Sequence, residues 1–221
     1  MREVPAEIPI NLAVEDELSE HLLRVSLAQS GRPFIVGVVY GRQGNGYLKR
    51  MLPAFASACR GSTHLVMVDL DDRPCAPDLI EDWFDCTIAM YAARRHPNLI
   101  FRIAVREAES WVMADRDAFA SFLGISLNHV PLRPDSLPDP KKALLDLVRK
   151  CRNRDLKNDI VPRPGEKRTI GPDYNGRLVE FVSSSWRASE AEKSSQSFGR
   201  TFAALKRFRP VLKSGNPPLS T

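Results

Sequence analysis

The sequence predicts an α/β fold of the Rossmann-like kind, with a parallel sheet flanked by helices and a small helical subdomain after it. Two observations carry this prediction. Four short apolar runs, rich in β-branched residues, alternate with helix-like segments along the first half of the chain, which is the pattern of a parallel, doubly wound sheet. Beyond residue 105 the strand-like runs stop and only helical patterns remain.

The first repeat runs from residue 8 to residue 33. Residues 8–14 (I-P-I-N-L-A-V) form the first expected strand, with Pro9 near its start, where a missing N–H donor matters least. A helix over 18–29 follows, because its leucines recur on one face. Serine, glycine and proline at 30–33 end that helix, and residues 34–39 (F-I-V-G-V-V) form the second strand.

The next two repeats follow the same order. A glycine-rich segment at 41–46 leads into a helix over 47–58, and residues 65–68 form a short, buried third strand. A helix over 77–94 begins with a proline, which suits a first helical turn. Residues 98–104 (N-L-I-F-R-I-A) form the fourth strand. Right-handed crossovers then place the carboxyl ends of all the strands at one edge of the sheet.

The rest of the chain is expected to be helical. A short helix ends near Asp115, which caps a helix over 117–123 that Gly124 terminates. A proline-rich connection at 131–140 leads to a helix over 139–152. Shorter helices are expected at 173–182, 187–193 and 197–207. The expected organisation is an α/β domain over 1–125, a basic helical extension over 126–210 and a flexible tail over 211–221.

The composition narrows the possible functions. The chain has 221 residues, a net charge of +5 and 43% hydrophobic residues, which is ordinary for a globular protein and compatible with a polyanionic partner. The four cysteines and four histidines are scattered, so neither a zinc site nor a disulfide framework is expected. No run approaches the ~18 apolar residues of a membrane span, and no signal peptide opens the chain. We therefore expect a cytoplasmic protein with no membrane partner.

Acidic residues follow three of the four expected strands. Asp69 and Asp71 come directly after the third strand, Glu15 after the first, and Glu107 and Glu109 after the fourth. Ligands of open α/β sheets bind at this edge, and carboxylate oxygens are the ligands that Mg²⁺ takes. Solvated turns and helix starts also favour acids, so each position has a purely structural explanation. Acids at three strand ends together predict a metal site.

The glycine-rich segment at 41–46 is not a nucleotide-phosphate loop. Gly41 and Gly46 have the right spacing, but Tyr47 and Leu48 stand where a phosphate loop has Lys and Ser or Thr. The dinucleotide fingerprint also fails, because its glycine spacing is absent. We expect a loop at the ligand edge, from which Arg42 and Lys49 contact phosphates.

These acids resemble the pattern of the Toprim domain, which type II topoisomerases, primases and OLD-type nucleases share. The match is a glutamate after the first strand, in Val-Glu-Asp-Glu at 14–17, and Asp-Leu-Asp-Asp at 69–72. More narrowly, the chain resembles a Toprim-related bacterial family often encoded beside ATPases in phage-defence neighbourhoods. That resemblance covers nearly the whole chain and rests further on the segments at 107–115, 139–142, 170–175 and 195–198. Toprim domains usually have glycine where this chain has Asp16, so Glu17 stays open as the alternative to Glu15.

The resemblance implies a metal-dependent nuclease that works with an ATPase partner on nucleic acid, with DNA expected rather than RNA. Mg²⁺ or Mn²⁺ would be the cofactor. The expected catalytic residues are Glu15, Asp69, Asp71 and Lys141, with Glu107 and Glu109 as further metal ligands. Arg42 and Lys49 stay open as alternatives to Lys141 for stabilising charge on the phosphate. The expected nucleic-acid contacts are Arg42, Lys49, Lys142, Lys167 and Arg168. Two alternatives stay open: a non-catalytic binding or scaffold subunit, and a nucleotide-sugar transferase or phosphatase with an Asp-x-Asp motif.

Overall fold

The predicted parallel α/β fold is confirmed. The computed structural model describes residues 7–41, 43–84 and 87–211. Within them lies a four-stranded parallel sheet with the strand order β2-β1-β3-β4. Its strands are β1 (Ile8–Val14), β2 (Phe34–Gly41), β3 (Thr63–Asp69) and β4 (Leu99–Ala104). The apolar runs in the sequence thus identified every strand of this sheet.

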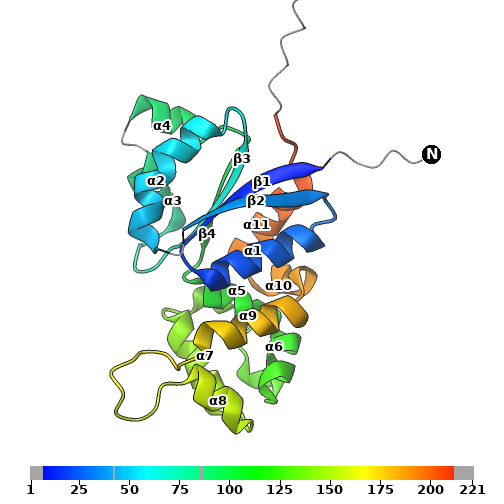
Figure 1. Cartoon of the computed structure of the whole chain (residues 1–221). Helices are drawn as coiled ribbons and strands as arrows, with labels where there is room; N and C mark the ends of the chain where they lie inside the picture. Colours follow the sequence, from blue (N-terminus) through cyan, green and yellow to red (C-terminus); the bar gives the residue numbers. More distant parts are fainter. Residues whose placement is uncertain (1–6, 42, 85–86, 212–221) are drawn as a thin grey trace, which may run out of the picture.

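Helices cover both faces of the sheet (Figure 1). On one face lie α1 (Glu17–Gln29) and α11 (Gln196–Arg207); on the other lie α2 (Asn45–Ala58), α3 (Ala76–Phe84) and α4 (Ile88–Ala93). The alternation of side chains along a strand produces this division. In β3, for example, Leu65 and Met67 pack with α1, whereas Val66 and Val68 pack with α2 and α3.

Two helical expectations need correction. The single helix expected over 77–94 is two helices, α3 and α4, because the side chain of Thr87 accepts the N–H of Met90 and starts a new helix there. Residues 85 and 86 lie outside the described part of the chain. A helix that the sequence did not predict, α8 (Arg154–Ile160), begins where Asn153 accepts the N–H groups of Asp155 and Leu156. Its seven residues include only two buried apolar ones, which is too few to show a helical period.

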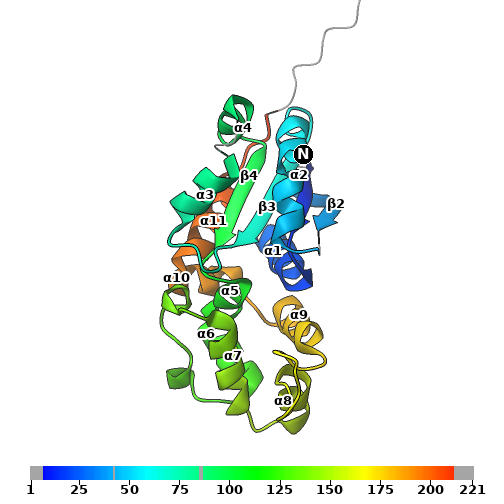
Figure 2. The ribbon, with the colours of Figure 1, turned by 90° about the vertical axis from the view of Figure 1, so that its left-hand side faces the viewer.

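The remaining helices lie beyond the carboxyl ends of the strands (Figure 2). They are α5 (Ala108–Ala114), α6 (Arg116–Leu123), α7 (Pro140–Arg149), α8, α9 (Tyr174–Ser184) and α10 (Ala188–Ser194). Two short 3₁₀ turns, Leu127–His129 and Pro134–Ser136, lie in the proline-rich connection. The predicted caps of α6 are confirmed: Asp115 accepts the N–H of Ala118, and Gly124 ends the helix in the left-handed conformation at φ 62°.

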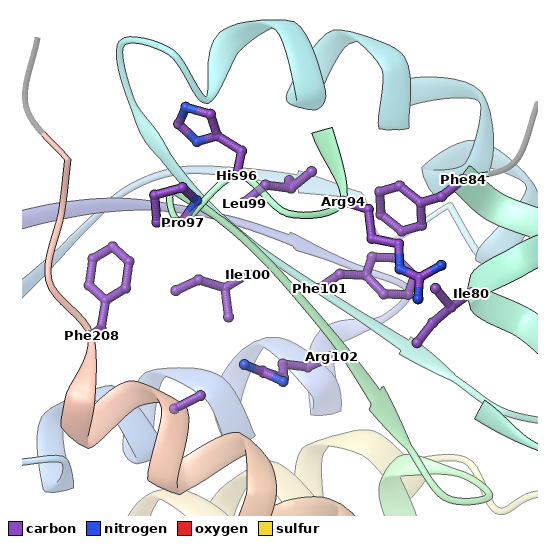
Figure 3. A pocket seen from close by; sticks show the side chains of 11 residues that line it. Ile80, Phe84, Arg94, His96, Pro97, Leu99, Ile100, Phe101, Arg102 and Phe208 are labelled. Atoms are coloured by element: carbon purple, nitrogen blue, oxygen red, sulfur yellow. The ribbon is translucent and has the colours of Figure 1, made fainter. Parts of the chain in front are cut away.

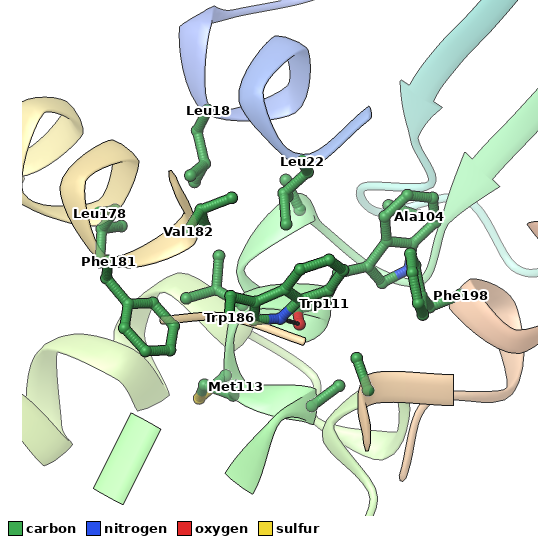
Figure 4. Close-up of a cluster of buried hydrophobic side chains, with 14 of the residues drawn as sticks. Leu18, Leu22, Ala104, Trp111, Met113, Leu178, Phe181, Val182, Trp186 and Phe198 are labelled. Carbon is green, nitrogen blue, oxygen red and sulfur yellow. Dashed lines mark hydrogen bonds between the residues drawn. The ribbon is translucent and has the colours of Figure 1, made fainter. Parts of the chain in front are cut away.

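One hydrophobic core joins these helices to the sheet. At its centre the rings of Trp111 and Trp186 each lie edge-on to Phe198, at centroid distances of 5.1 and 5.0 Å (Figure 4). Both indole N–H groups are satisfied, since Trp111 donates to Ser197 Oγ and Trp186 to the carbonyl of Trp111. The ranges 1–125 and 126–210 therefore share a core, and the helical extension holds the carboxyl edge of the sheet in place.

The C-terminal end of the described chain is held to the sheet at the start of β4. The side-chain amide of Asn98 donates to the carbonyl of Val211 at 2.9 Å and accepts its N–H at 2.9 Å. The rest of the expected tail, 212–221, lies outside the described residues. Among the residues that are described, no helix has the length and apolar character that a membrane span requires.

Candidate functional site

The strand order places the candidate site between β1 and β3. From β1 the chain crosses outward to β2 on one side, and β3 pairs with β1 on the other. The carboxyl ends of the two strands flanking such a switch in direction border the crevice where open α/β sheets bind ligands. Glu15 directly follows β1, and Asp69 is the last residue of β3. Two of the acids singled out in the sequence, Glu15 and Asp69, therefore lie at the switch point.

Glu15 and Asp69 are in direct contact. The main-chain N–H of Asp69 donates to Oε1 of Glu15 at 2.9 Å. The glycine-rich loop holds this end of β1 in place, because the N–H of Gly44 donates to the carbonyl of Glu15 at 3.2 Å. Gly41 has φ 122°, and a Cβ there would lie 1.8 Å from the carbonyl oxygen of Val14, so only glycine lets the two strands meet here. Glu15, rather than Glu17, is thus the glutamate that meets Asp69.

Asp69 holds an unsatisfied oxygen. Its Oδ1 is buried and has no hydrogen-bond partner among the described residues. Burial raises the pKa of Asp69 well above its ordinary value, and the charges of Glu109 and Glu15 raise it further. Burial likewise raises the pKa of Glu15 to about 7, although the hydrogen bond from Asp69 lowers it. The ionised forms of both carboxylates are therefore unfavourable, and a nearby positive charge would stabilise them.

Asp71 adds a third carboxylate from the loop after β3. Its charge raises the pKa of both Glu15 and Asp69, so it acts on the same site. Its backbone lies in the left-handed region, at φ 52°, a conformation that few residues other than glycine, asparagine and aspartate adopt easily. Arg106 fixes the loop by donating to the carbonyls of Asp71 and Arg73, at 2.9 and 3.0 Å.

The acids after β4 are bound to protein partners. Oε2 of Glu107 accepts the main-chain N–H of Lys141 at 2.9 Å and so holds the first turn of α7. Glu109 is buried; its Oε1 accepts the hydroxyl of Tyr174 at 2.7 Å and lies 3.5 Å from Nζ of Lys141. Burial alone would lower the pKa of Lys141, but the charges of Glu109, Glu107 and Asp69 outweigh it and raise that pKa, so the lysine stays cationic.

A cleft of 740 Å³ opens between the loop after β3 and α7. Its volume lies within the range of roughly 300 to 1,000 Å³ that is usual for ligand-binding pockets. Asp71, Asp72 and Glu107 line its acidic side, and Lys141, Lys142 and Arg149 line its basic side. Acids beside a row of cations suit a polyanion held near a metal site. Asp71 connects this cleft, which runs toward the helical extension, to the Glu15–Asp69 site.

The predicted phosphate-contacting residues do not all lie together. Lys142 lines the cleft and pairs with Asp146 at 3.0 Å. Lys49 pairs with Asp82 at 2.8 Å and lines a smaller hollow of 270 Å³ that also includes Asp71. Lys167 and Arg168 are exposed on the connection between α8 and α9, where Thr169 is the residue that reaches the cleft. Arg42 lies outside the described residues.

The donor set suits a hard cation with an incomplete protein shell. No group of three or more His, Cys, Asp or Glu side chains within the described ranges is arranged to hold a metal. Mg²⁺ nevertheless keeps several waters and is commonly held by only one or two carboxylates. The unpartnered Oδ1 of Asp69 and the buried carboxyl of Glu15 are the two groups here that could act as such ligands.

Two residues at the site have roles that the sequence did not reveal. Arg106 clamps the Asp71 loop, and Tyr174 holds Glu109. The turn before α9, which carries Tyr174, requires glycine at 171, because a Cβ there would lie 2.3 Å from the carbonyl oxygen of Asp159. Comparison with family models, curated proteins and solved structures found no match to this chain. The function is therefore argued from the site.

Proposed function

We propose that this protein is a divalent-cation-dependent nuclease that hydrolyses phosphodiester bonds. One observation carries the proposal: Glu15 and Asp69 meet at the switch point of a parallel sheet, while Oδ1 of Asp69 is buried and unpartnered within the described chain. Perturbed acids in a crevice are typical of catalytic and metal sites. The resemblance to Toprim nucleases, whose matching residues include these two acids, supports the same chemistry.

Asp69, Glu15 and Asp71 would hold Mg²⁺ or Mn²⁺. When bound, such an ion polarises a phosphoryl oxygen and lowers the pKa of a coordinated water. Glu15 has a second possible role, because a carboxylate with a pKa of about 7 accepts a proton efficiently near neutral pH. In hydrolysis it would take the proton of the water that attacks phosphorus, while the P–O bond to the departing sugar oxygen breaks.

Lys141 would stabilise charge on the phosphate. It projects from the first turn of α7, lines the cleft beside Asp71 and stays protonated through its acidic neighbours. A fixed cation next to the scissile group favours the transition state, in which charge develops on the phosphoryl oxygens. Glu107 and Glu109 would serve the site by holding Lys141 and α7, and a second metal ion would need one of them to exchange its protein partner.

The substrate and setting are proposed on two grounds. The basic side of the cleft, with Lys141, Lys142 and Arg149, suits a nucleic-acid backbone, and we propose DNA as the substrate. The segment 41–46 lacks the residues of a nucleotide-phosphate loop. We therefore propose a separate ATPase partner, in a cytoplasmic phage-defence setting, as the resemblance implies.

A scaffold role is the second candidate, and a specific observation favours it. The described residues hold no cluster of three metal-ligating side chains, and Glu107 and Glu109 are both bound to protein partners. A non-catalytic subunit would keep the fold and the basic cleft without needing a cation. It predicts DNA binding that Mg²⁺ does not change.

Plasmid cleavage distinguishes the two candidates. Purified protein is incubated with supercoiled plasmid in Mg²⁺, in Mn²⁺ and in EDTA, as the wild type, as Asp69→Asn and as the exposed control Asp117→Asn. If the protein is a nuclease, the wild type nicks the plasmid only when the cation is present. Asp69→Asn should lower this activity by about 100-fold or more, and Asp117→Asn should leave it unchanged. Cation-independent cleavage, or undiminished cleavage by Asp69→Asn, contradicts the proposal.

A further inference from the structure

The outer edge of β4 has unpaired main-chain groups. On its inner side β4 pairs with β3. At one end of this ladder the N–H of His64 donates to the carbonyl of Asn98, and at the other end the N–H of Leu70 donates to the carbonyl of Ala104. Alternation along a parallel ladder then directs the main-chain groups of Phe101 and Ile103 outward. No strand of the described chain pairs with that side. An open edge of this kind is a template for one more strand.

A pocket of 340 Å³ runs along this edge and reaches both faces of the sheet (Figure 3). On the face covered by α3, the ring of Phe101 packs against Phe84, with centroids 5.1 Å apart, and Arg94 lies near them. On the face covered by α11, Arg102 lies beside Ile100 and the end of that helix. Figure 3 shows Arg94 and Arg102 on opposite sides of the β4 ribbon.

Among the described residues, the two arginines of the pocket have no acidic partner. Neither forms an ion pair within the described residues, and no Asp or Glu lines the pocket. Nε of Arg102 is buried with no hydrogen-bond partner among those residues, and burial lowers the pKa of this arginine. A buried N–H donor without an acceptor is unfavourable, so an acceptor from a bound partner would stabilise Arg102 here.

We propose that the β4 edge binds an extended acidic segment of a partner protein as a fifth strand. Its main chain would pair with Phe101 and Ile103, and two neighbouring carboxylates would reach Arg94 on one face and Arg102 on the other. Successive side chains of a strand point to opposite faces, so an adjacent acidic pair matches this arrangement. A single small anion matches it less well, because the arginines lie on the two sides of β4.

The chain's own C-terminal segment does not have the required charge. Residues 212–221 (L-K-S-G-N-P-P-L-S-T) contain Lys213 and no acid, and two prolines in them lack the N–H that strand pairing needs. The proposed acidic segment is therefore not the C-terminal segment, and we assign it to another protein. This inference does not depend on nuclease activity, since it uses the outer side of β4, which faces away from β3 and its Asp69.

The test uses a fluorescein-labelled hexapeptide, Thr-Val-Glu-Glu-Val-Thr, and a matched peptide with glutamines in place of the glutamates. Binding is followed by fluorescence anisotropy, and the amides of residues 99–104 by hydrogen exchange. We expect saturable binding of the acidic peptide and slower exchange at Phe101 and Ile103. Arg102→Gln and Arg94→Gln should each weaken binding at least about tenfold. Arg95→Gln is the matched control, because Arg95 stacks on Tyr91 at 5.3 Å but does not line the pocket.

Several outcomes would overturn the proposal. They are no saturable binding, equal binding of the glutamine peptide, binding without protection of residues 99–104, and unchanged binding by Arg102→Gln with a native circular dichroism spectrum. Inorganic phosphate that gives the same protection would identify a small-anion pocket instead. Concentration-dependent self-association of Arg102→Val, with peptide binding intact, would show that Arg102 only blocks pairing between copies.

Discussion

The main-chain N–H of Asp69 donates a hydrogen bond to Oε1 of Glu15 at 2.9 Å, joining the ends of two parallel strands that are 54 residues apart in sequence. The contact satisfies one oxygen of Glu15, but Oδ1 of Asp69 remains buried without a partner in the described chain. Folding thus brings carboxylates together at a place where water cannot fully solvate them. This unfavourable charge should affect the stability of the fold even when no substrate is bound.

The Glu15 carboxyl should make the cation-free protein less stable as pH rises. Its pKa is raised from 4.5 to about 7 by burial, so between these values the folded state holds a proton that the unfolded state releases. The stabilisation is fully present below 4.5 and is lost as pH rises through 7. Glu15→Gln cannot ionise and keeps an acceptor for Asp69. It should therefore be more stable than the wild type by on the order of 2 kcal/mol near pH 8, and equal to it near pH 4.

Urea denaturation in EDTA at both pH values measures this difference. Glu17→Gln is the control, because Glu17 lies in the first turn of α1 and does not contact Asp69. It should gain nothing near pH 8. A Glu15→Gln protein that is no more stable than the wild type near pH 8, or an equal gain in Glu17→Gln, would contradict the assigned role of Glu15.

The Tyr174 hydroxyl should stabilise the fold through its hydrogen bond to the buried carboxylate of Glu109. It donates to Oε1 of Glu109 at 2.7 Å, and Tyr174→Phe removes this donor while the ring stays in the core. The buried carboxylate then loses a partner, and the free energy of unfolding should fall by about 1–3 kcal/mol. Denaturation of the two proteins at neutral pH measures this loss.

Tyr91→Phe is the matched control, since the Tyr91 hydroxyl lies on the exposed α4 and only accepts from Arg95 at 3.3 Å. It should change stability by less than about 0.5 kcal/mol. If the two substitutions have the same small effect, the Tyr174–Glu109 bond does not stabilise the site.

The sequence predicted the sheet and the acidic edge because both depend on local patterns. Each strand is a short apolar run, and Asp69 and Glu15 stand directly after two of them. Their meeting could be anticipated, since the carboxyl ends of parallel strands lie at one edge. Arg106 and the left-handed backbone of Asp71 were not anticipated, because a loop's path depends on contacts with β4 that no local pattern encodes.

The long-range partners of the predicted residues could not be predicted from the sequence for the same reason. Tyr174 and Glu109 are 65 residues apart, and their bond depends on how α9 packs against α5. Lys49 was expected to contact phosphate, yet its nearest charge is Asp82, 33 residues away in α3. The break between α3 and α4 was missed because the cap at Thr87 outweighed a continuous apolar pattern.

Cation binding tests the central claim most directly, because it depends on neither a substrate nor a partner. Mn²⁺ is titrated into metal-free protein by isothermal calorimetry near pH 7.5, with the wild type, Asp69→Asn, Glu15→Gln and the exposed control Asp117→Asn. We predict saturable binding that Asp69→Asn and Glu15→Gln each weaken at least about tenfold and that Asp117→Asn leaves unchanged. Wild-type protein that shows no saturable binding up to about 10 mM cation, or Asp69→Asn that binds as tightly as the wild type, would contradict a metal site between β1 and β3.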